Sequence, residues 1–195
     1  EVVPAGETEK IADILTERIA TIGENIQIRR FARMTGDLYA YIHNGGGSII
    51  GSMIKLESAD ANSDAVKAVA KDLLLQITAS APQFVQQSDV PASVIEAEKE
   101  VQLNLVKKEN AESAKPKPEN VLEKIVEGRM RKFAEEICLL DQPFVKDPSL
   151  TVAKYIAAAG NDIKVVSFVR FEKGEGIEKK VDDFAAEVEA MAKGE

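Results

Sequence analysis

The sequence has one cysteine, one histidine and no long apolar run among its 195 residues. A single cysteine, Cys138, excludes an internal disulfide, and together with a single histidine it excludes the usual zinc ligand sets. No segment is apolar over the length needed to span a bilayer, no secretory signal opens the chain, and no acidic run has calcium-loop spacing. We therefore expect no metal or other cofactor and no membrane segment. The expected compartment is the bacterial cytoplasm, or alternatively an organellar matrix or stroma.

Positive charge is also in short supply. Lys and Arg total 25 against 33 Asp and Glu, which gives a net charge of -8. Because phosphate binding requires a surplus of positive charge, this balance argues against direct nucleic-acid binding. A hydrophobic content of 45% with 30% charged residues is typical of a globular protein. The chain opens at Glu1 rather than at a methionine, and we expect a fragment or a processed product.

Hydrophobic periodicity predicts one helix and then three strands in the first part of the chain. The helix covers residues 8–20, with Thr8 as a possible N-cap. The strands are predicted in the segments NIQIRRFARM (25–34), DLYAYIHN (37–44) and SIIGSMIKLES (48–58). The glycine-rich link at 44–47 predicts a hairpin between the last two strands, and Ser63 is predicted to cap the next helix.

The middle of the chain predicts a helical hairpin. Two helices of similar length occupy residues 88–141, joined by the Pro- and Lys-rich segment AESAKPKPEN. The second helix halts at Pro143 and carries an apolar stripe at spacings of 4, 4, 3, 4 and 3, namely Leu122, Val126, Met130, Phe133, Ile137 and Leu140. Such a pair forms an antiparallel, coiled-coil-like hairpin that protrudes from the body.

The last part of the chain returns to mixed structure. A helix is predicted over residues 149–159, and DIKVVSFVRFEKG (162–174) is the longest strand candidate. Ile177, Val181, Phe184, Val188 and Met191 predict a C-terminal helix, which could belong to the core or dock on a partner. The predicted fold class is therefore α+β: an antiparallel sheet with packed helices, an inserted antiparallel helical hairpin and a C-terminal helix.

The residue types that perform chemistry are scarce. Cys138 and His43 could form a nucleophile–base pair, but Cys138 stands between apolar neighbours, which favours a packing role. The glycines at 45–47 are not followed by the Gly-Lys-Ser/Thr that ends a P-loop, and GEGIEK lacks the third glycine of a dinucleotide-binding motif. No serine lies in a G-x-S-x-G nucleophile motif. We predict no catalytic residue and a protein that is not an enzyme.

Two surface features leave alternatives open. His43 shares a strand face with Tyr39 and Tyr41 beside the glycine turn, which fits either a partner-contact patch or a half-exposed strand-end histidine. The segment RRFAR (29–33) fits either a salt-bridged strand face or a patch that steers an acidic partner.

Several motifs together resemble elongation factor Ts. They are IGENIQIRRF, YIH, VEGRMRKF, QPFVKD, TVAKYI and VRFEKGEGIE, in that order, and the similarity runs from about Ile19 to the C-terminus. The resemblance implies a guanine-nucleotide exchange factor for elongation factor Tu, the GTPase that delivers aminoacyl-tRNA. Such a factor binds the nucleotide-free GTPase and promotes GDP release, without a catalytic side chain. The alternative is a structural module that oligomerises through the helical hairpin.

The resemblance also implies a division into parts. Residues 1–37 correspond to the remainder of an N-terminal core subdomain, and residues 38–85 with 142–175 to a C-terminal core subdomain. Residues 86–141 correspond to a dimerisation domain, which implies a possible homodimer, and residues 176–195 to a C-terminal module that docks on the GTPase. The family's ubiquitin-associated-like domain and T-D-F-V motif are absent, so we expect binding to survive better than exchange.

The resemblance implies contacts to the GTPase at Ile22 and His43. The full set of predicted partner-binding residues comes from three of these parts, namely Ile22, Gly23, Asn25, Arg29, Tyr41, His43, Phe184 and Val188.

Overall fold

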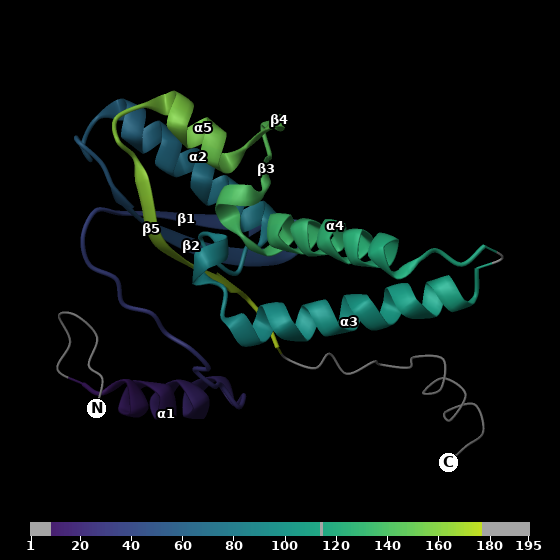
Figure 1. Cartoon of the computed structure of the whole chain (residues 1–195). Coiled ribbons are helices and arrows are strands. Elements are labelled where there is room, and N and C mark those ends of the chain that lie inside the picture. Colours follow the sequence, from purple (N-terminus) through teal and green to yellow (C-terminus); the bar gives the residue numbers. More distant parts are fainter. Residues whose placement is uncertain (1–8, 114, 177–195) are drawn as a thin grey trace, which may run out of the picture. The chain divides into compact units, whose positions relative to one another are not determined.

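The computed structural model describes residues 9–113 and 115–176, which fall into two units divided after Met34 (Figure 1). The first unit contains helix α1 (Ile11–Ile22). This helix begins later than predicted, with Lys10 at its N-cap, and Thr8 lies outside the described residues. The strand predicted over residues 25–34 is wrong, because that segment contains neither helix nor strand. Alternating apolar residues form a strand only beside a hydrogen-bonded neighbour, and no described strand pairs with this segment.

The second unit is built on an antiparallel sheet with the strand order β1-β2-β5. Strand β1 spans Leu38–Gly45, β2 spans Ser48–Glu57 and β5 spans Lys164–Glu172. The predicted β1–β2 hairpin is confirmed: Gly45 pairs with Ser48, which leaves a two-residue turn. Gly46 and Gly47 have φ angles of 62° and 82°, the combination that a tight hairpin turn requires. Among the strands of the described residues the longest is β2 with 10 residues, not β5 with 9 as predicted.

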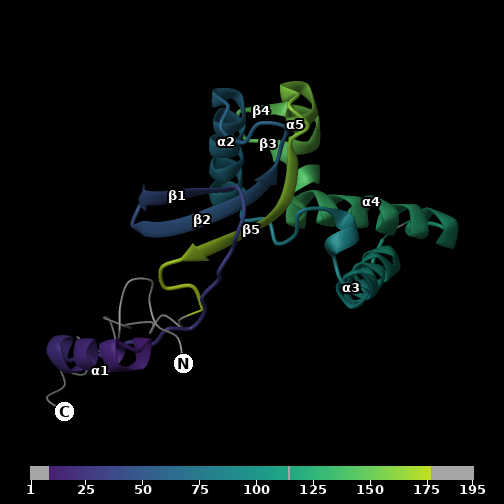
Figure 2. The same ribbon diagram turned by 90° about the vertical axis from the view of Figure 1, so that its left-hand side faces the viewer.

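Helix α2 (Asp64–Ser80) covers one face of this sheet. Ser63 caps it as predicted, since its hydroxyl accepts a hydrogen bond from the Val66 N–H at 3.3 Å. Leu73 and Ile77 of α2 pack in the same core cluster as Ile54 of β2, and each of the three is fully buried. Figures 1 and 2 both show a second helix, α5 (Val152–Ala159), beside α2 on this side of the sheet.

A small hairpin precedes α5 and was not predicted. Strand β3 (Pro143–Phe144) pairs with β4 (Asp147–Thr151). Because β4 occupies these residues, α5 begins at Val152 instead of residue 149, with the Thr151 hydroxyl accepting from the Lys154 N–H at 3.3 Å. The helix ends before Gly160, as expected.

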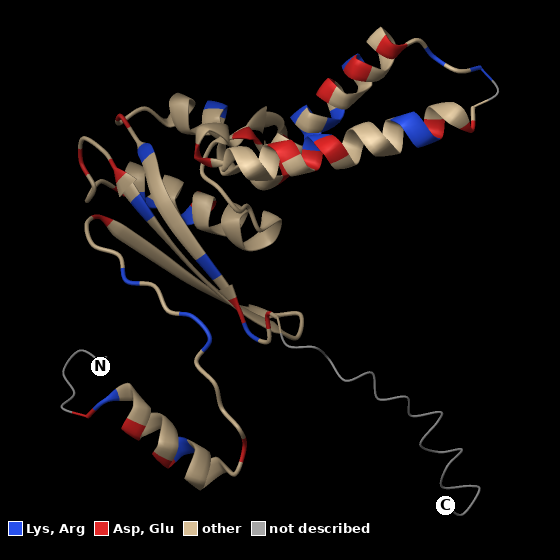
Figure 3. Cartoon of the chain, turned by 60° about the horizontal axis from the view of Figure 1, so that its bottom comes forward, with Lys and Arg blue, Asp and Glu red and all other residues tan. Residues whose placement is uncertain are grey.

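The helical hairpin consists of α3 (Ala92–Ala111) and α4 (Glu119–Ile137). Its seam buries Val106 against Leu122 and Val126. Charged residues are spread along both helices, whereas the three strands of the sheet contain few (Figure 3). None of the described helices, these two included, is long and apolar enough to span a membrane.

The base of the hairpin is fixed by backbone hydrogen bonds. The Phe84 N–H donates to the Ile137 carbonyl at 3.0 Å, and the Leu139 N–H donates back to the Phe84 carbonyl at 2.9 Å. Helix α4 therefore ends at Ile137 and not at Pro143, because Cys138 adopts an extended conformation and bridges to Phe84. Two 3-10 turns, η1 (Gln87–Asp89) and η2 (Leu139–Asp141), flank this base.

The fold is α+β, as predicted. The helix predicted at the C-terminus falls on residues 177–195, which lie outside the described residues.

The two faces of the sheet differ in burial. Ser52, Ile54 and Leu56 are buried beneath α2. On the opposite face Ile42 is 72% exposed and Ile49 is 40% exposed. Because side chains alternate along a strand, β1 and β2 each contribute apolar residues to both faces.

This difference predicts unequal costs for the same truncation on the two faces. Ile54→Ala should lower the free energy of unfolding by about 2–5 kcal/mol, because it leaves a cavity in a fully packed core. Ile42→Ala should cost less than about 1 kcal/mol, because most of that side chain already contacts water. Urea unfolding followed by circular dichroism measures both. Equal costs would contradict the assignment of the two faces.

Candidate partner-binding surface

His43 is held in one orientation near the end of β1. Its Nδ1 lies 3.2 Å from the Tyr41 hydroxyl, and the two ring centroids are 6.2 Å apart with planes inclined at 42°. Tyr41 is itself half-buried against the core cluster. On the other side of the imidazole, a Cβ added at Gly45 would lie 3.3 Å from the His43 Nε2. The tyrosine hydroxyl and the missing side chain at position 45 together define the space that the ring occupies.

The strand register extends this site across the sheet. His43 pairs with Ile50, which pairs with Glu172, and Tyr41 pairs with Ser52, which pairs with Arg170. Residues that pair across strands share a face of the sheet. Both cross-strand rows, His43–Ile50–Glu172 and Tyr41–Ser52–Arg170, therefore lie on the face that α2 covers. Adjacent strands are about 4.8 Å apart, which places His43 and Glu172 about 10 Å from each other.

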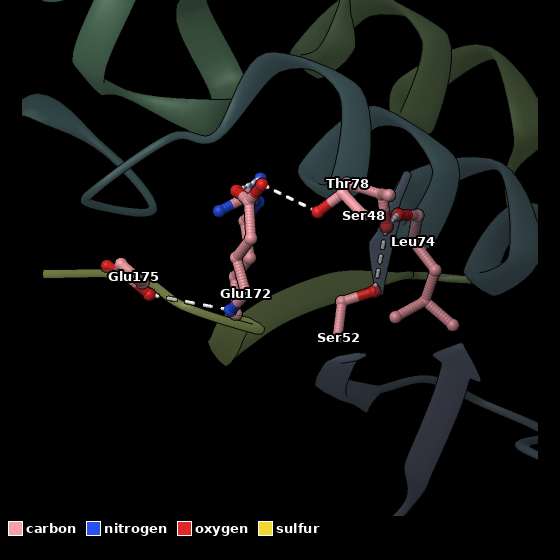
Figure 4. A network of polar contacts seen from close by, with 7 residues as sticks. Ser48, Ser52, Leu74, Thr78, Glu172 and Glu175 are labelled. Atoms are coloured by element: carbon pink, nitrogen blue, oxygen red, sulfur yellow. Dashed lines mark hydrogen bonds and ion pairs between the residues drawn. The ribbon is translucent and has the colours of Figure 1, made fainter. Parts of the chain in front are cut away.

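Helix α2 contacts the row that contains Tyr41, Ser52 and Arg170. The buried Ser52 hydroxyl lies 3.0 Å from the Thr78 hydroxyl, and Thr78 donates in turn to the Leu74 carbonyl at 2.7 Å (Figure 4). Thr78 belongs to the last turn of α2. The row that contains His43 is therefore one step farther along the strands, toward the turn of the hairpin.

A charged cluster occupies the β5 end of the same face. The Ser48 hydroxyl donates to Glu172 Oε1 at 2.7 Å, and Arg170 Nη2 donates to Glu172 Oε2 at 2.8 Å (Figure 4). The Ser48 hydroxyl, and after it Arg170, holds the pKa of the Glu172 carboxyl below its ordinary value. The Arg170 side chain is 16% exposed, and its Nε is buried with no hydrogen-bond partner among the described residues.

Sequence reasoning missed this cluster, although one signal was present. Arg170 and Glu172 are two residues apart in a predicted strand, which places both on one face. Their proximity to Ser48 depends on the β2–β5 register, which joins residues 124 positions apart in the sequence.

The other predicted site residues lie elsewhere. Ile22 is the last residue of α1 and is 57% exposed. Gly23 follows it with φ 78° and donates its N–H to the Ile19 carbonyl at 2.8 Å, which ends the helix. Asn25 and Arg29 are exposed in the segment that follows. These four belong to the first unit, whereas Tyr41 and His43 belong to the second. Phe184 and Val188 lie outside the described residues.

Cys138 has the surroundings of a packing residue. Its side chain is fully buried in a cluster with Val90 and Ile137 at the base of the hairpin. Burial, and after it the nearby Asp141 and Asp89, raises the pKa of the thiol to about 11. Such a thiol is protonated at neutral pH and is a poor nucleophile. Within residues 9–113 and 115–176, no group of three or more His, Cys, Asp or Glu is placed to hold a metal ion.

Comparison with known proteins gives one consistent family. The family profile described as Elongation factor TS matches residues 2–175. A protein named Elongation factor Ts from Aeromonas salmonicida is 46% identical over 187 residues, which cover 95% of this chain and 58% of that protein. The proteins of the same name from Clostridium acetobutylicum and Idiomarina loihiensis are 40% and 47% identical, over 93% and 89% of this chain and 59% and 54% of their own lengths. The chain thus spans little more than half of each of these relatives.

The burial of Cys138 predicts low reactivity and a specific pH dependence. In the folded protein at pH 8 the thiol should react with a disulfide reagent only as fast as the protein opens. Because the folded pKa of about 11 exceeds the ordinary value of 9.0, the folded state holds this proton more tightly. The contribution of Cys138 to the free energy of unfolding is therefore complete below pH 9 and is lost as pH rises toward 11.

Cys138→Ala is the matched control, since it removes this contribution while other groups still titrate. It should cost about 1–2 kcal/mol of stability at pH 7 and leave partner binding unchanged. Rapid modification of the native thiol at pH 8 would contradict the packing role.

Proposed function

This chain belongs to the elongation factor Ts family, and on that basis we propose that it binds elongation factor Tu and takes part in promoting release of GDP. The observation that carries the proposal is the fixed position of His43, held by Tyr41 at the end of a hairpin that α2 anchors. A contact residue that is already ordered loses little conformational entropy on binding. We propose the cytoplasm as the compartment.

The mechanism follows from linked binding equilibria. If the exchange factor and GDP each weaken the other's affinity for the GTPase, binding of the factor speeds nucleotide release without any bond being made or broken. The chain then needs ordered contact residues and no catalytic group. The exposed Ile22 at the end of α1 is a second contact of this kind, with Gly23 and Asn25 beside it and Arg29 farther along the chain.

The alternative function, oligomerisation through the helical hairpin, has less support. The comparisons favour the exchange-factor family, and nothing in them indicates a homodimer. Oligomerisation through the hairpin therefore stays a prediction without support from the comparisons.

The proposal is tested by the release of a fluorescent GDP analogue from elongation factor Tu, with and without this chain. Faster release is expected if the chain carries exchange activity. If release is unchanged but calorimetry still detects a complex with the nucleotide-free GTPase, the chain binds and does not exchange. Absence of both would overturn the proposal.

His43→Ala should weaken binding to the nucleotide-free GTPase by about 1–2 kcal/mol, or about 5- to 30-fold in Kd, the range of ordinary interface truncations. Asn44→Ala is the control, because Asn44 follows on the same strand and points to the opposite face. Tyr41→Phe removes only the hydroxyl that orients the imidazole and should give a smaller loss. Equal affinity of parent and His43→Ala would remove His43 from the interface.

Replacement of residues 87–136 by a short Gly-Ser linker should leave binding to the GTPase intact, because none of the proposed contact residues lies between positions 87 and 136. It should lower the melting temperature, since Ile137 and Cys138 lose the packing of Val90 and Phe133. Calorimetry and circular dichroism measure the two effects. Loss of binding by a variant whose sheet remains folded would show that the hairpin contributes to the interface.

A further inference from the structure

His43 is bonded at only one of its two ring nitrogens. Its Nδ1 lies 3.2 Å from the Tyr41 hydroxyl. Within residues 9–113 and 115–176 no group forms a hydrogen bond with its Nε2. The side chain is half-buried, so part of the ring faces solvent. The second nitrogen is therefore left for a group outside the described residues.

The bond to Tyr41 can run in either direction, and its direction decides what Nε2 presents. A neutral imidazole has one N–H donor and one bare nitrogen that accepts, whereas a phenol hydroxyl can do both. If the Tyr41 hydroxyl donates to Nδ1, the proton of the ring is on Nε2. If Nδ1–H donates to the Tyr41 oxygen, Nε2 is a bare acceptor and the Tyr41 O–H has no acceptor among the described residues.

Acid–base chemistry favours the first direction. A free imidazole takes up a proton near about pH 6.5, so its bare nitrogen is a strong acceptor, and a free phenol loses its proton near about pH 10, so its hydroxyl is a good donor. The phenol oxygen is the weaker acceptor, because its lone pair is delocalised into the ring. The best donor therefore meets the best acceptor when the Tyr41 hydroxyl donates to Nδ1 of His43. In that arrangement Nε2 carries the proton and is itself a donor.

Gly45 keeps the Nε2 edge of the ring uncovered. A Cβ at this position would lie 3.3 Å from the His43 Nε2 and 3.6 Å from its Cε1. The backbone does not require glycine here, because Gly45 has no positive φ and pairs with Ser48 in the ladder. An N–H···O bond places its acceptor about 2.7–3.2 Å from the nitrogen. The space left by the missing side chain is therefore at the distance where an acceptor oxygen would bond to Nε2.

The carboxylate on the same cross-strand row is already engaged. Glu172 Oε1 accepts from the Ser48 hydroxyl at 2.7 Å, and Glu172 Oε2 accepts from Arg170 at 2.8 Å. Two strand spacings, about 10 Å, separate Glu172 from His43. Ile50 stands between them and has no side-chain acceptor. This row thus supplies no acceptor for Nε2, which is left for a bound partner.

We propose that Tyr41 and Gly45 hold His43 in the form protonated at Nε2, and that the group it meets on the GTPase is an oxygen acceptor seated in the space beside Gly45. The inference rests on the proposed function and names the chemistry of one of its contacts. Tyr41 and Gly45 are positioning residues that act through the ring: the first sets which nitrogen carries the proton, and the second keeps that nitrogen accessible. A partner that presented a donor at this point would be rejected, because two donors would then face each other unpaired.

The position of the proton can be measured in the free chain, without the GTPase. His43 is the only histidine among the 195 residues, so labelling histidine with nitrogen-15 in an untagged chain gives the signals of one imidazole. Two-bond proton–nitrogen correlation spectra at alkaline pH, where an imidazole is neutral, distinguish the protonated nitrogen from the bare one. We expect the proton on Nε2 in the parent and a mixture of both forms in Tyr41→Phe. A proton on Nδ1 in the parent, or an unchanged spectrum in Tyr41→Phe, would overturn the proposal whether or not the chain binds the GTPase.

Two substitutions of equal length test the polarity of the contact. Glutamine and glutamate can both reach the place of Nε2, but only the amide of glutamine donates a hydrogen bond, because an ionised carboxylate only accepts. His43→Gln should stay within about 3-fold of the parent affinity for the nucleotide-free GTPase. His43→Glu should lose more than about 30-fold, because two acceptors then face each other. If His43→Glu binds as well as His43→Gln, the ring does not act as a donor and the proposal is wrong.

Gly45→Ala tests the space beside Nε2, and Gly51→Ala is the matched control. Both glycines lie in strands of the sheet and neither has a positive φ. A Cβ at Gly51 would meet nothing within 4 Å, whereas one at Gly45 would meet the His43 ring at 3.3 Å. Gly45→Ala should weaken binding to the nucleotide-free GTPase about 10-fold, and Gly51→Ala should bind as the parent does.

A double-mutant cycle shows whether Gly45 acts through the ring. In a His43→Ala background the imidazole is gone, so Gly45→Ala should cause no further loss of affinity. An equal loss in both backgrounds would show that the glycine serves the backbone alone and would overturn the proposal, as would full affinity of Gly45→Ala in the parent background. If the parent chain itself fails to bind the nucleotide-free GTPase, the proposed function is wrong, while the protonation of His43 is still decided by the spectra of the free chain.

Discussion

The second unit depends on one buried amide, the side chain of Gln76 in α2. It is fully buried, and its Oε1 accepts from the Val145 N–H at 2.8 Å. Its Nε2 lies 3.0 Å from Gln142 Oε1 and 3.2 Å from the Pro143 carbonyl, and Gln142 donates to the Glu136 carbonyl at 2.8 Å. A buried amide left without partners would cost about 1–3 kcal/mol, so these bonds fix one arrangement of the segment after the hairpin against α2. The base of the hairpin is placed by this network as much as by apolar packing.

The same helix also supports the proposed contact surface. Gln76 points toward the hairpin base, while Thr78, two residues later, bonds to Ser52 in the centre of the sheet. One turn of α2 thus holds two parts of the second unit that are far apart in the sequence. Because Ser52 stands between Tyr41 and Arg170, the row next to His43 is fixed by a rigid element. Contact residues on such a scaffold keep their geometry better than residues on a loop.

Sequence patterns predicted correctly the elements that depend only on residues close together in the sequence. Alternating apolar residues and two turn glycines were enough for the β1–β2 hairpin, and Ser63 was enough for the start of α2. The strand predicted over 25–34 failed because period-two alternation gives no information about a pairing partner. The cluster at Glu172 was missed because it depends on the non-local register of β2 and β5. The β3–β4 hairpin is local, but its strands have only two and five residues, too few to show a period-two pattern. The apolar neighbours of Cys138 predicted its burial, but not the bridge to Phe84 that ends α4.

The two interpretations of His43 that the sequence left open differ in how far the ring is ordered. The side chain of a half-exposed strand-end histidine with no contact role would rotate freely in solvent, and no neighbouring residue would be arranged around it. Here the Tyr41 hydroxyl meets Nδ1, and a side chain at position 45 would approach Nε2 to 3.3 Å. The glycine at position 45 therefore serves the ring as well as the turn, since the two turn positions proper are 46 and 47. A ring with one nitrogen bonded and space kept beside the other is prepared to make a directed contact, which favours the partner-contact interpretation.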